Sequence, residues 1–537
     1  MYRPTLEKAL FPEQTDQPVI EKTIGQLLIE AEASDPEASS ILEVGLNGET
    51  GREWTYAQLL HDAQELARAL STRFAKGERV VVWSPNTPEW IILEYACALA
   101  GVTLVTANPA YQAKELAYVL RQSGAVALFL VHEYRGNPMA RIAAEAVKDA
   151  PAVREVVDTE DPAGMLARGD RPEALPEVMP DDEAMIQYTS GTTGFPKGAR
   201  LSHRGLVTNA NHFMARAGVR HGDVVCSYMP MFHTSGCAMC VLGAAQRAAK
   251  VVQFRIFDPH AVLDRTEADR IAFVFGVPTM LVALLEAYSV KPRDLSSVRV
   301  AISGGSMVAP DLVKRISDTF GCDFQIVYGQ TETCPLICEH QSTDSFQDKC
   351  ETLGQPMPRM SVAIRRVEDG SIADLGEIGE ICVKGYNVML GYNDDPEATA
   401  AAIGEDGWLR TGDLGTMDAP GYLRITGRVK EMIIRGGENL FPAEIENRLL
   451  EHPDVAEVAV VGLPDDKWGE IVAAAIRPSP GATLDPEALK AHCRAALAPM
   501  KTPVEWRLAK AFPLTGSGKI RKFEVRDAIV AGELPSL

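Results

Sequence analysis

Residues 188–198 read Tyr-Thr-Ser-Gly-Thr-Thr-Gly-Phe-Pro-Lys-Gly, a run of small, hydroxyl and glycine residues that ends in a lysine. Glycines let a backbone curl tightly and present its N–H groups, while hydroxyls and an ammonium group add donors and positive charge. The run therefore predicts a loop that binds a polyphosphate, and the alternative is an exposed turn, because turns favour the same residues. The glycine spacing differs from a Walker A loop. Because Pro196 disfavours a helix at Phe195, we expect Lys197 to lie on a mobile loop. The candidate phosphate-binding residues are Thr189, Ser190, Gly191, Thr192, Thr193, Gly194 and Lys197.

Composition and charge exclude several classes of function. The chain has 537 residues, 46% of them hydrophobic, and a formal net charge of −20. A length of this order predicts two to four structural units. The negative field disfavours nucleic acid as a partner, so an anionic substrate must meet a local site rich in N–H groups or cations. We find no apolar leader and no uncharged apolar run of membrane-spanning length, and therefore expect a soluble, cytoplasmic protein without a membrane span.

Ten cysteines are scattered along the chain, and two of them, Cys237 and Cys240, form a single C-x-x-C. No second pair stands at the spacing of a zinc site. The favoured interpretation is a set of small apolar thiols in or near a core, and the alternative is a redox or metal-binding pair.

The order of apolar segments predicts an α/β protein with parallel sheets. Strands expected at 79–83, 102–105, 125–131, 272–275, 298–302 and 324–327 alternate with helices at 54–72, 90–100 and 112–122. After about residue 350, short glycine-punctuated strands at 361–366, 379–384 and 421–425 indicate a β-rich subdomain. Beyond residues 428–431 comes an α+β pattern, with helices at 442–452 and 485–497 around strands at 455–462 and 470–477. We therefore predict a large body, residues 1–429, of two βαβ-type subdomains plus the β-rich subdomain, followed by a small α+β domain, residues 430–537.

A second motif, Tyr328-Gly-Gln-Thr-Glu-Thr333, directly follows the strand expected at 324–327. Ligands of open α/β sheets gather at the carboxyl ends of strands. At such an edge an aromatic ring can stack on adenine, the Thr331 hydroxyl can meet an α-phosphate, and Glu332 can hold Mg²⁺. The alternative is a polar loop with one buried tyrosine.

Three weaker signals follow the same pattern. Ser303-Gly-Gly-Ser306 stands at another strand end, where glycines let a flat base approach the backbone. Asp413 in Thr-Gly-Asp can accept both hydroxyls of a ribose, with Arg428 in support, although an isolated Thr-Gly-Asp is usually a turn. Lys519 lies in the glycine-rich Pro513–Arg521, where a lysine is normally just solvated.

Together these motifs resemble those of the adenylate-forming (AMP-binding) superfamily. The resemblance spans roughly residues 50–530 and is nearest the acyl-CoA synthetase branch, in particular medium- and long-chain fatty-acyl-CoA ligases. It implies the adenylate-forming fold, with ATP, Mg²⁺ and coenzyme A as cofactors and substrates. It also implies that Lys519 bridges the substrate carboxylate and the α-phosphate, removing the repulsion between two anions. The implied nucleotide-binding residues outside the first motif are Gly304, Gly305, Ser306, Tyr328, Gly329, Gln330, Thr331, Asp413 and Arg428, with Glu332 as the Mg²⁺ ligand.

The same resemblance makes residues 430–537 a mobile lid that turns about Lys430 between two half-reactions. The turn would bring Gly436, Gly437 and Glu438 to the active site as part of a CoA channel. Trp468 is either a further CoA contact or a packed surface tryptophan. His233 occupies the position that gates the acyl pocket. The apolar residues 237–245 that follow it line an alkyl tunnel or form a core helix.

The function implied is an ATP-dependent carboxylate:CoA ligase that forms acyl-AMP and then acyl-CoA. A medium- or long-chain fatty acid is the expected substrate. The alternatives are an aryl or arylpropionate CoA ligase and an acyl-AMP ligase that loads a carrier protein in trans. A luciferase-like oxygenase has no support in the sequence. The presence of Lys519, Glu332 and Lys430 argues against a nucleotide sensor without activity, because such a sensor would need no catalytic lysine or hinge. The oligomeric state stays open, with a homodimer as one option.

Overall fold

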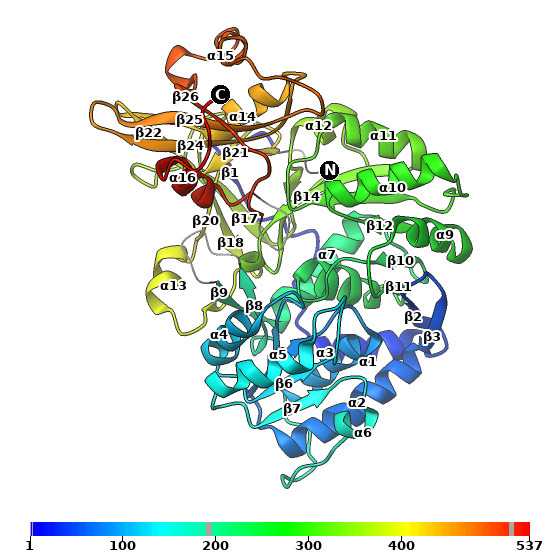
Figure 1. Cartoon of the computed structure of the whole chain (residues 1–537). Helices are drawn as coiled ribbons and strands as arrows, with labels where there is room; N and C mark the ends of the chain where they lie inside the picture. The colour runs from blue at the N-terminus through cyan, green and yellow to red at the C-terminus, as the bar shows by residue number, and fades with distance from the viewer. Residues whose placement is uncertain (1, 3, 190–195, 515–519) are drawn as a thin grey trace.

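A computed structural model describes residues 2, 4–189, 196–514 and 520–537. Figure 1 shows a large body, coloured blue to yellow, and a smaller C-terminal part in orange and red at one end. The four sheets follow one another nearly in chain order. The prediction of an α/β fold with parallel sheets, a β-rich subdomain and an α+β C-terminal part is confirmed.

The first sheet has seven strands in the order β19-β9-β8-β5-β4-β6-β7, of which β4, β5, β6, β7 and β8 run parallel. Its centre is the Val80-Val81-Val82 run predicted from the sequence, fully buried because helices cover both faces. The strands are β4 (Arg79–Trp83), β5 (Thr103–Thr106), β6 (Ala127–Leu130), β7 (Glu155–Asp158), β8 (Glu183–Thr189), β9 (Lys197–Ser202) and β19 (Gly391–Tyr392). The helices beside them are α1 (Ile24–Ser34), α2 (Tyr56–Arg73), α3 (Pro88–Ala100), α4 (Ala113–Ser123), α5 (Met139–Ala146), the 3₁₀ helix η1 (Val147–Asp149), and α6 (Pro162–Met165).

Helix α3 illustrates how local sequence sets these bounds. The Thr87 hydroxyl caps its first turn by accepting from the Trp90 N–H, and Pro88 stands at the first helical position. Gly101, with φ +65°, ends the helix in the left-handed conformation.

The second sheet has nine strands in the order β16-β15-β14-β13-β12-β10-β11-β2-β3, with a parallel centre and antiparallel edges. The strands are β2 (Ser39–Val44), β3 (Thr50–Thr55), β10 (Val224–Ser227), β11 (Lys250–Phe254), β12 (Phe273–Phe275), β13 (Val300–Gly304), β14 (Asp323–Gly329), β15 (Leu336–Glu339) and β16 (Gln355–Pro356). Around them lie α7 (His203–Arg216), the π-helix η2 (Ser235–Leu242), α8 (Gly243–Ala245), α9 (Pro259–Asp269), α10 (Pro278–Val290), α11 (Pro310–Phe320), the 3₁₀ helix η3 (Thr331–Thr333) and α12 (Phe346–Glu351).

The third sheet is the predicted β-rich subdomain. Its antiparallel strands follow the order β1-β17-β18-β20-β21 and are β1 (Leu10–Phe11), β17 (Met360–Arg365), β18 (Gly379–Gly385), β20 (Leu409–Met417) and β21 (Leu423–Arg428). Helix α13 (Pro396–Ala402) lies between β18 and β20 in the sequence. Strands β20 and β21 form a hairpin. Its register places Asp413 of β20 opposite Arg428 of β21.

The C-terminal part begins after β21, where the 3₁₀ helix η4 (Val429–Glu431) leads into a separate sheet. Its strands are β22 (Ile433–Arg435), β23 (Glu438–Leu440), β24 (Val455–Asp465), β25 (Gly469–Pro478) and β26 (Glu505–Leu508). Its helices are α14 (Pro442–Leu450), α15 (Pro486–Arg494), the 3₁₀ helix η5 (Pro499–Lys501) and α16 (Lys522–Val530). Two small apolar clusters of its own, one on each face of β24 and β25, give this part an independent core.

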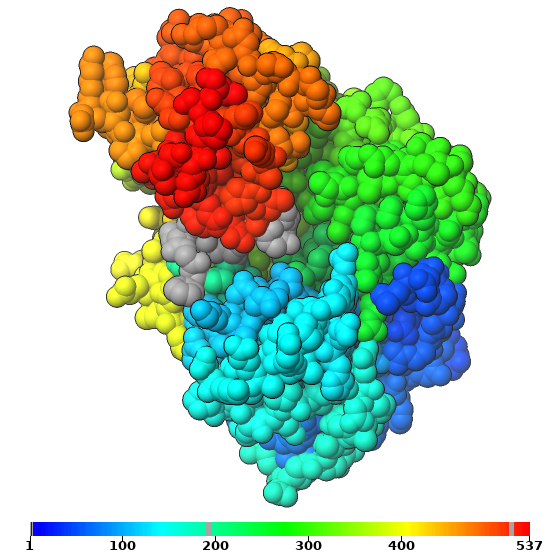
Figure 2. All heavy atoms as spheres, viewed as in Figure 1, coloured from blue at the N-terminus to red at the C-terminus, as the bar shows by residue number. Residues whose placement is uncertain are grey.

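In Figure 2 the C-terminal residues, orange and red, form a lobe beside the green residues of the second sheet. Within the described residues, no helix combines the length and apolar character that crossing a membrane requires.

Candidate active site

The candidate site lies at the carboxyl ends of β13 and β14, the position where open parallel sheets bind ligands. The register pairs Gly304 with Val327, so the glycine strip and the Tyr328 motif lie side by side. A Cβ on Gly304 would stand 2.6 Å from both the Val327 side chain and its carbonyl oxygen, which only glycine avoids. Gly305, with φ +78°, and Ser306 continue the strip as exposed residues.

A buried carboxylate, Asp413, joins two parts of the site. The Tyr328 hydroxyl donates to its Oδ2 at 2.9 Å, and Arg428 Nε lies 2.9 Å from its Oδ1. Strand register explains the second contact, because Asp413 on β20 pairs with Arg428 on β21. Burial raises the pKa of Tyr328 well above its usual value, so the phenol keeps its proton and donates it. The neighbouring Asp413 charge raises the pKa of Arg428.

Glu332 forms the second cluster. It lies in the 3₁₀ helix η3 with Thr331, and both are buried. The Tyr392 hydroxyl donates to Glu332 Oε1 at 2.8 Å, and Lys197 Nζ stands 5.0 Å from the centre of the same Tyr392 ring. Burial raises the pKa of the Glu332 carboxyl. Within the described part of the chain, no lysine or arginine forms an ion pair with it.

The first motif is only partly visible in the structure. Ser190, Gly191, Thr192, Thr193 and Gly194 lie outside the described residues. Thr189 and Lys197 face each other as the innermost described pair of the β8–β9 hairpin. The expectation that Lys197 rides a loop is wrong, because Lys197 is the first residue of strand β9. Pairing with Thr189 makes Lys197, the residue directly after Pro196, part of the ladder, and local sequence does not reveal this partner.

The rest of the second motif is held by its own backbone. The Gln330 N–H donates to the Pro335 carbonyl at 2.9 Å, which turns the chain back towards β15. A Cβ on Gly329 would stand 2.0 Å from that same carbonyl oxygen, so this turn requires glycine.

His233 precedes the π-helix η2 as an exposed residue, and its Nδ1 lies 3.2 Å from the Ser235 hydroxyl. All eight residues of η2 are buried, as are the three residues of α8 that follow. Cys237 and Cys240 are free and buried in this helix, which supports the apolar-thiol interpretation. Among the residues that the structure describes, no group of three or more histidine, cysteine or acidic side chains could hold a metal ion.

The C-terminal candidates lie on the surface. Lys430 is exposed in η4, and Gly436, Gly437 and Glu438 are exposed in and beside the turn between β22 and β23. Trp468 is 43% exposed, with Lys467 Nζ 4.8 Å from the centre of its ring. A Cβ on Gly436 would stand 2.9 Å from the Trp468 ring, so the turn and the indole are closely packed. Lys519 lies outside the described residues.

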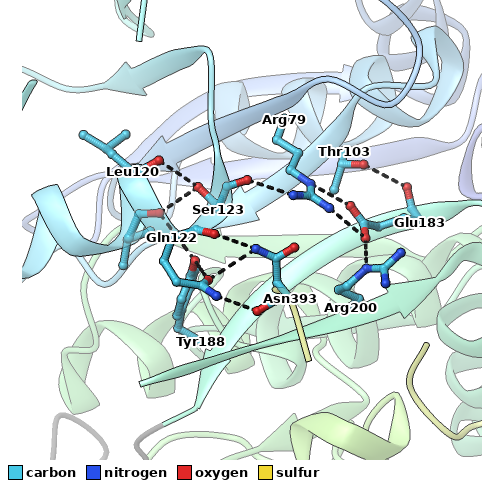
Figure 3. A network of polar contacts seen from close by, with 10 residues as sticks. Arg79, Thr103, Leu120, Gln122, Ser123, Glu183, Tyr188, Arg200 and Asn393 are labelled. Atoms are coloured by element: carbon cyan, nitrogen blue, oxygen red, sulfur yellow. Dashed lines mark hydrogen bonds and ion pairs between the residues drawn. The ribbon is translucent and has the colours of Figure 1, made fainter. Parts of the chain in front are cut away.

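Sequence reasoning missed three side chains beside the site, Gln122, Tyr392 and Asn393. Figure 3 shows Gln122 and Asn393 exchanging hydrogen bonds next to Tyr188. No periodicity or motif spacing marks them, because Gln122 lies in a helix and Asn393, directly after strand β19, is 271 residues further along the chain. Only the pairing of β19 with β9 brings them together.

The chain matches two family models. The model of the AMP-binding enzyme matches residues 30–393, and that of the AMP-binding enzyme C-terminal domain matches residues 444–519. YngI of Bacillus subtilis (strain 168) is 36% identical, over 95% of this chain and 98% of its own. The mitochondrial medium-chain acyl-CoA ligase ACSF2 of Macaca fascicularis is 34% identical, over 96% and 88%.

Two solved structures are similar throughout. ATP-bound MatB from Rhodopseudomonas palustris superposes with a TM-score of 0.83 and 28% identity, covering 94% of this chain and 99% of MatB. The o-succinylbenzoate CoA synthetase MenE from Bacillus subtilis, in complex with ATP and magnesium ion, has a TM-score of 0.81 and 28% identity, covering 95% and 100%.

Proposed function

The chain belongs to the AMP-binding enzyme family, and on this premise we propose how its residues carry out the reaction. The protein is an ATP-dependent carboxylate:CoA ligase of the AMP-forming type. In the first step a carboxylate oxygen of the acid attacks the α-phosphorus of ATP, the bond from that phosphorus to the bridging oxygen breaks, and pyrophosphate leaves. In the second step the CoA thiolate attacks the acyl carbon, and AMP leaves with the electrons of the acyl C–O bond.

The cluster of Tyr328, Asp413 and Arg428 carries this proposal. Asp413, in the middle of β20, is a carboxylate fixed from two sides, by Tyr328 and by Arg428, with little freedom to reorient. A carboxylate held in this way suits the two neighbouring hydroxyls of a ribose. From there the α-phosphate would reach the Thr331 hydroxyl, one residue before Glu332, and the adenine would lie along Gly304 and Gly305.

The residues present fit a magnesium ion. Glu332 is a buried carboxylate without a cationic partner among the described residues, and hard oxygen ligands are those Mg²⁺ prefers. Mg²⁺ is usually held by one or two carboxylates together with substrate phosphates, which agrees with a single acidic side chain here. When bound, the ion would neutralise phosphate charge. Glu332 would hold it, and Lys197 with the 188–198 stretch would hold the outer phosphates.

Lys519 would supply the cation between the carboxylate and the α-phosphate, two anions that otherwise repel each other. For the second step we propose that residues 430–537 turn about Lys430, which removes Lys519 and presents Gly436, Gly437 and Glu438 to the site. The exposed Trp468 beside Lys467 offers an aromatic face and a positive charge, which suit the nucleotide of CoA.

For the acid we propose a medium-chain fatty acid, which would place the enzyme in fatty acid metabolism. The supporting observation is the named activity of the ACSF2 relative, together with an apolar, uncharged π-helix behind His233. An aryl or arylpropionate acid is the second candidate, and loading of a carrier protein in trans is the third. A cytoplasmic location is consistent with ten free cysteines. Light scattering would measure whether the protein forms a homodimer.

The proposal is tested by carboxylate-dependent exchange of labelled pyrophosphate into ATP. Straight-chain acids of four to sixteen carbons, benzoate and phenylpropionate are compared, with and without CoA. We expect exchange with Mg²⁺ and a medium-chain acid, and acyl-CoA formation when CoA is added. Exchange with none of these acids would overturn the proposed function, and a maximum with an aryl acid would replace the substrate.

A further inference from the structure

One short segment, Met389–Asn393, crosses between the two motifs of the site. We call it the bridging segment. Its backbone binds both sides: the Met389 N–H donates to the Glu332 carbonyl at 2.9 Å, and the Asn393 N–H donates to the Gly198 carbonyl at 2.8 Å. Between these contacts β19 pairs antiparallel with β9, the strand that begins at Lys197. The segment therefore fixes the distance between the Glu332 helix and the end of the phosphate-loop stretch.

The side chain of Tyr392 repeats this connection at the functional groups themselves. Its hydroxyl donates to Glu332 Oε1 at 2.8 Å, while the face of its ring lies 5.0 Å from Lys197 Nζ. A cation over an aromatic face is attracted electrostatically, and more strongly where water is partly excluded. Tyr392 is only partly exposed. One side chain thus contacts the Glu332 carboxylate through its hydroxyl and the Lys197 ammonium group through the face of its ring.

Asn393 extends the connection to the other end of the phosphate-loop stretch. Its Nδ2 donates to the Gln122 carbonyl at 2.6 Å, and Gln122 Nε2 donates back to the Asn393 carbonyl at 2.5 Å. The Tyr188 hydroxyl donates to Gln122 Oε1 at 2.6 Å. Figure 3 shows these three side chains facing one another. Of the first and last residues of the stretch, Gly198 is therefore bound directly by the bridging segment, and Tyr188 is connected to it through Gln122.

We propose that Tyr392 is a positioning residue for the adenylation step. Its hydroxyl sets the orientation of the Glu332 carboxylate, and its ring sets the position of Lys197. The carboxylate that would hold Mg²⁺ and the cation that would hold the outer phosphates are thereby kept at one spacing. This inference rests on the proposed function, because it assigns a role within the same site. Supports of this kind matter because displacement of a functional group by about 1 Å can cost on the order of a hundredfold in rate.

The test compares Tyr392→Phe with the parent enzyme. The phenylalanine keeps the ring under Lys197 and removes only the hydrogen bond to Glu332. We expect pyrophosphate exchange to fall about tenfold, the loss of one hydrogen bond to a charged group. The Mg²⁺ concentration that gives half-maximal exchange should rise, and thioester formation from supplied acyl-AMP should stay within about twofold of the parent.

A binding measurement separates positioning from general damage. Calorimetry with α,β-methylene-ATP gives the gain in affinity that Mg²⁺ confers, and this gain should shrink severalfold in Tyr392→Phe. Tyr392→Leu, which also removes the ring, should in addition weaken binding measured without Mg²⁺, because Lys197 loses the aromatic face.

Tyr386→Phe is the matched control. Tyr386 is another partly exposed tyrosine six residues earlier, and its hydroxyl lies 3.1 Å from His212 Nδ1 and 3.4 Å from Asn209 Nδ2, away from Glu332. We expect it to leave the Mg²⁺ dependence unchanged, even where it lowers the melting temperature. If Tyr392→Phe keeps the parent's Mg²⁺ gain in binding while the parent adenylates normally, the positioning role is wrong and the proposed function stands. If the parent enzyme itself shows no pyrophosphate exchange, the proposed function is wrong, and the positioning role that rests on it is wrong as well.

Discussion

The body and the C-terminal domain present their candidate residues in opposite ways. In the body, Tyr328, Glu332 and Asp413 are buried, and each is fixed by a hydrogen bond or ion pair from another strand. In the C-terminal domain, Lys430 and the Gly436–Glu438 turn are exposed. The first arrangement holds its groups in place before any ligand arrives, and the second leaves them free to meet one.

This difference agrees with the proposal that one enzyme runs two reactions on one bound adenylate. The charged groups that bind the nucleotide are needed in both steps, so we expect them on the rigid body. Groups needed in only one step belong on a unit that can change its position. The following variants test whether burial and exposure divide the chemistry in this way.

The largest effect is expected from Lys519→Ala. Loss of one positioned charge at the centre of the transition state costs on the order of a hundred- to a thousandfold. Pyrophosphate exchange should fall by this amount, while acyl-CoA formation from supplied acyl-AMP should be largely spared, because in the proposed mechanism the second step does not use this lysine. Single-turnover assays of the two half-reactions provide the measurement.

Two further variants provide the control and the complementary test for Lys519→Ala. Lys510→Ala removes an exposed lysine of the same domain and should leave both half-reactions intact. Lys430→Pro should give the reverse pattern, with adenylation kept and thioester formation lost, because proline fixes φ at the proposed pivot. Equal loss of both half-reactions in Lys519→Ala would contradict the division of labour between the two regions.

Asp413→Asn tests the buried side of the comparison. Asparagine keeps the shape and an acceptor for Tyr328 but removes the charge that faces Arg428. We expect kcat/KM for ATP to fall about 10- to 100-fold, the range for hydrogen bonds to a charged group. Asp418→Asn is the matched control, because Asp418 forms a similar pair with Arg424 at the far end of the same hairpin. Similar losses in the two variants would mean that the hairpin, and not the ribose site, is being damaged.

Acid should weaken the body through its buried histidines. Burial lowers the pKa of His203, His212 and His340 to about 4. Below about pH 6.5 the unfolded chain binds protons that the folded chain does not, so stability falls as the pH drops from 7 towards 4. Each histidine contributes about 2 kcal/mol of this loss between pH 7 and pH 5.

The measurement is urea unfolding at both pH values, followed by the fluorescence of the buried Trp83 and Trp90. His203→Asn, which keeps an acceptor for the Ile24 N–H, should remove about 2 kcal/mol of the pH dependence. An unchanged pH dependence in His203→Asn would show that this histidine is not held neutral.

The smallest effect is expected at the exposed side, from Trp468→Ala. Stacking on one aromatic ring contributes about 0.5–1.5 kcal/mol, so KM for CoA should rise about two- to twelvefold with KM for ATP unchanged. Trp408→Ala, which removes a tryptophan of the body that lies 4.8 Å from an arginine, serves as the control. A change in KM for ATP but not for CoA would show that Trp468 contributes to ATP binding and not to CoA binding.

Local sequence went far in predicting the fold. The bounds of β4 agree with the prediction to the residue, and those of α2, α3 and α14 agree within about two residues. These elements carry strong signals, such as a threonine cap, a first-turn proline or a run of valines. The strand at Lys197 was missed, because its ladder partner and not its own sequence makes it a strand.

The sequence by itself determined the chemistry on offer: a glycine- and hydroxyl-rich stretch, a carboxylate after a strand, an aspartate after a glycine, and a lysine near the C-terminus. Short motifs carry this information because each one fixes residue type and backbone conformation together. Only the tertiary structure decided which of these groups touch: Asp413 meets Tyr328 across 85 residues, and Glu332 meets Tyr392 across 60. Strand order and register set such pairs. They depend on how the whole chain packs, and no local pattern encodes that.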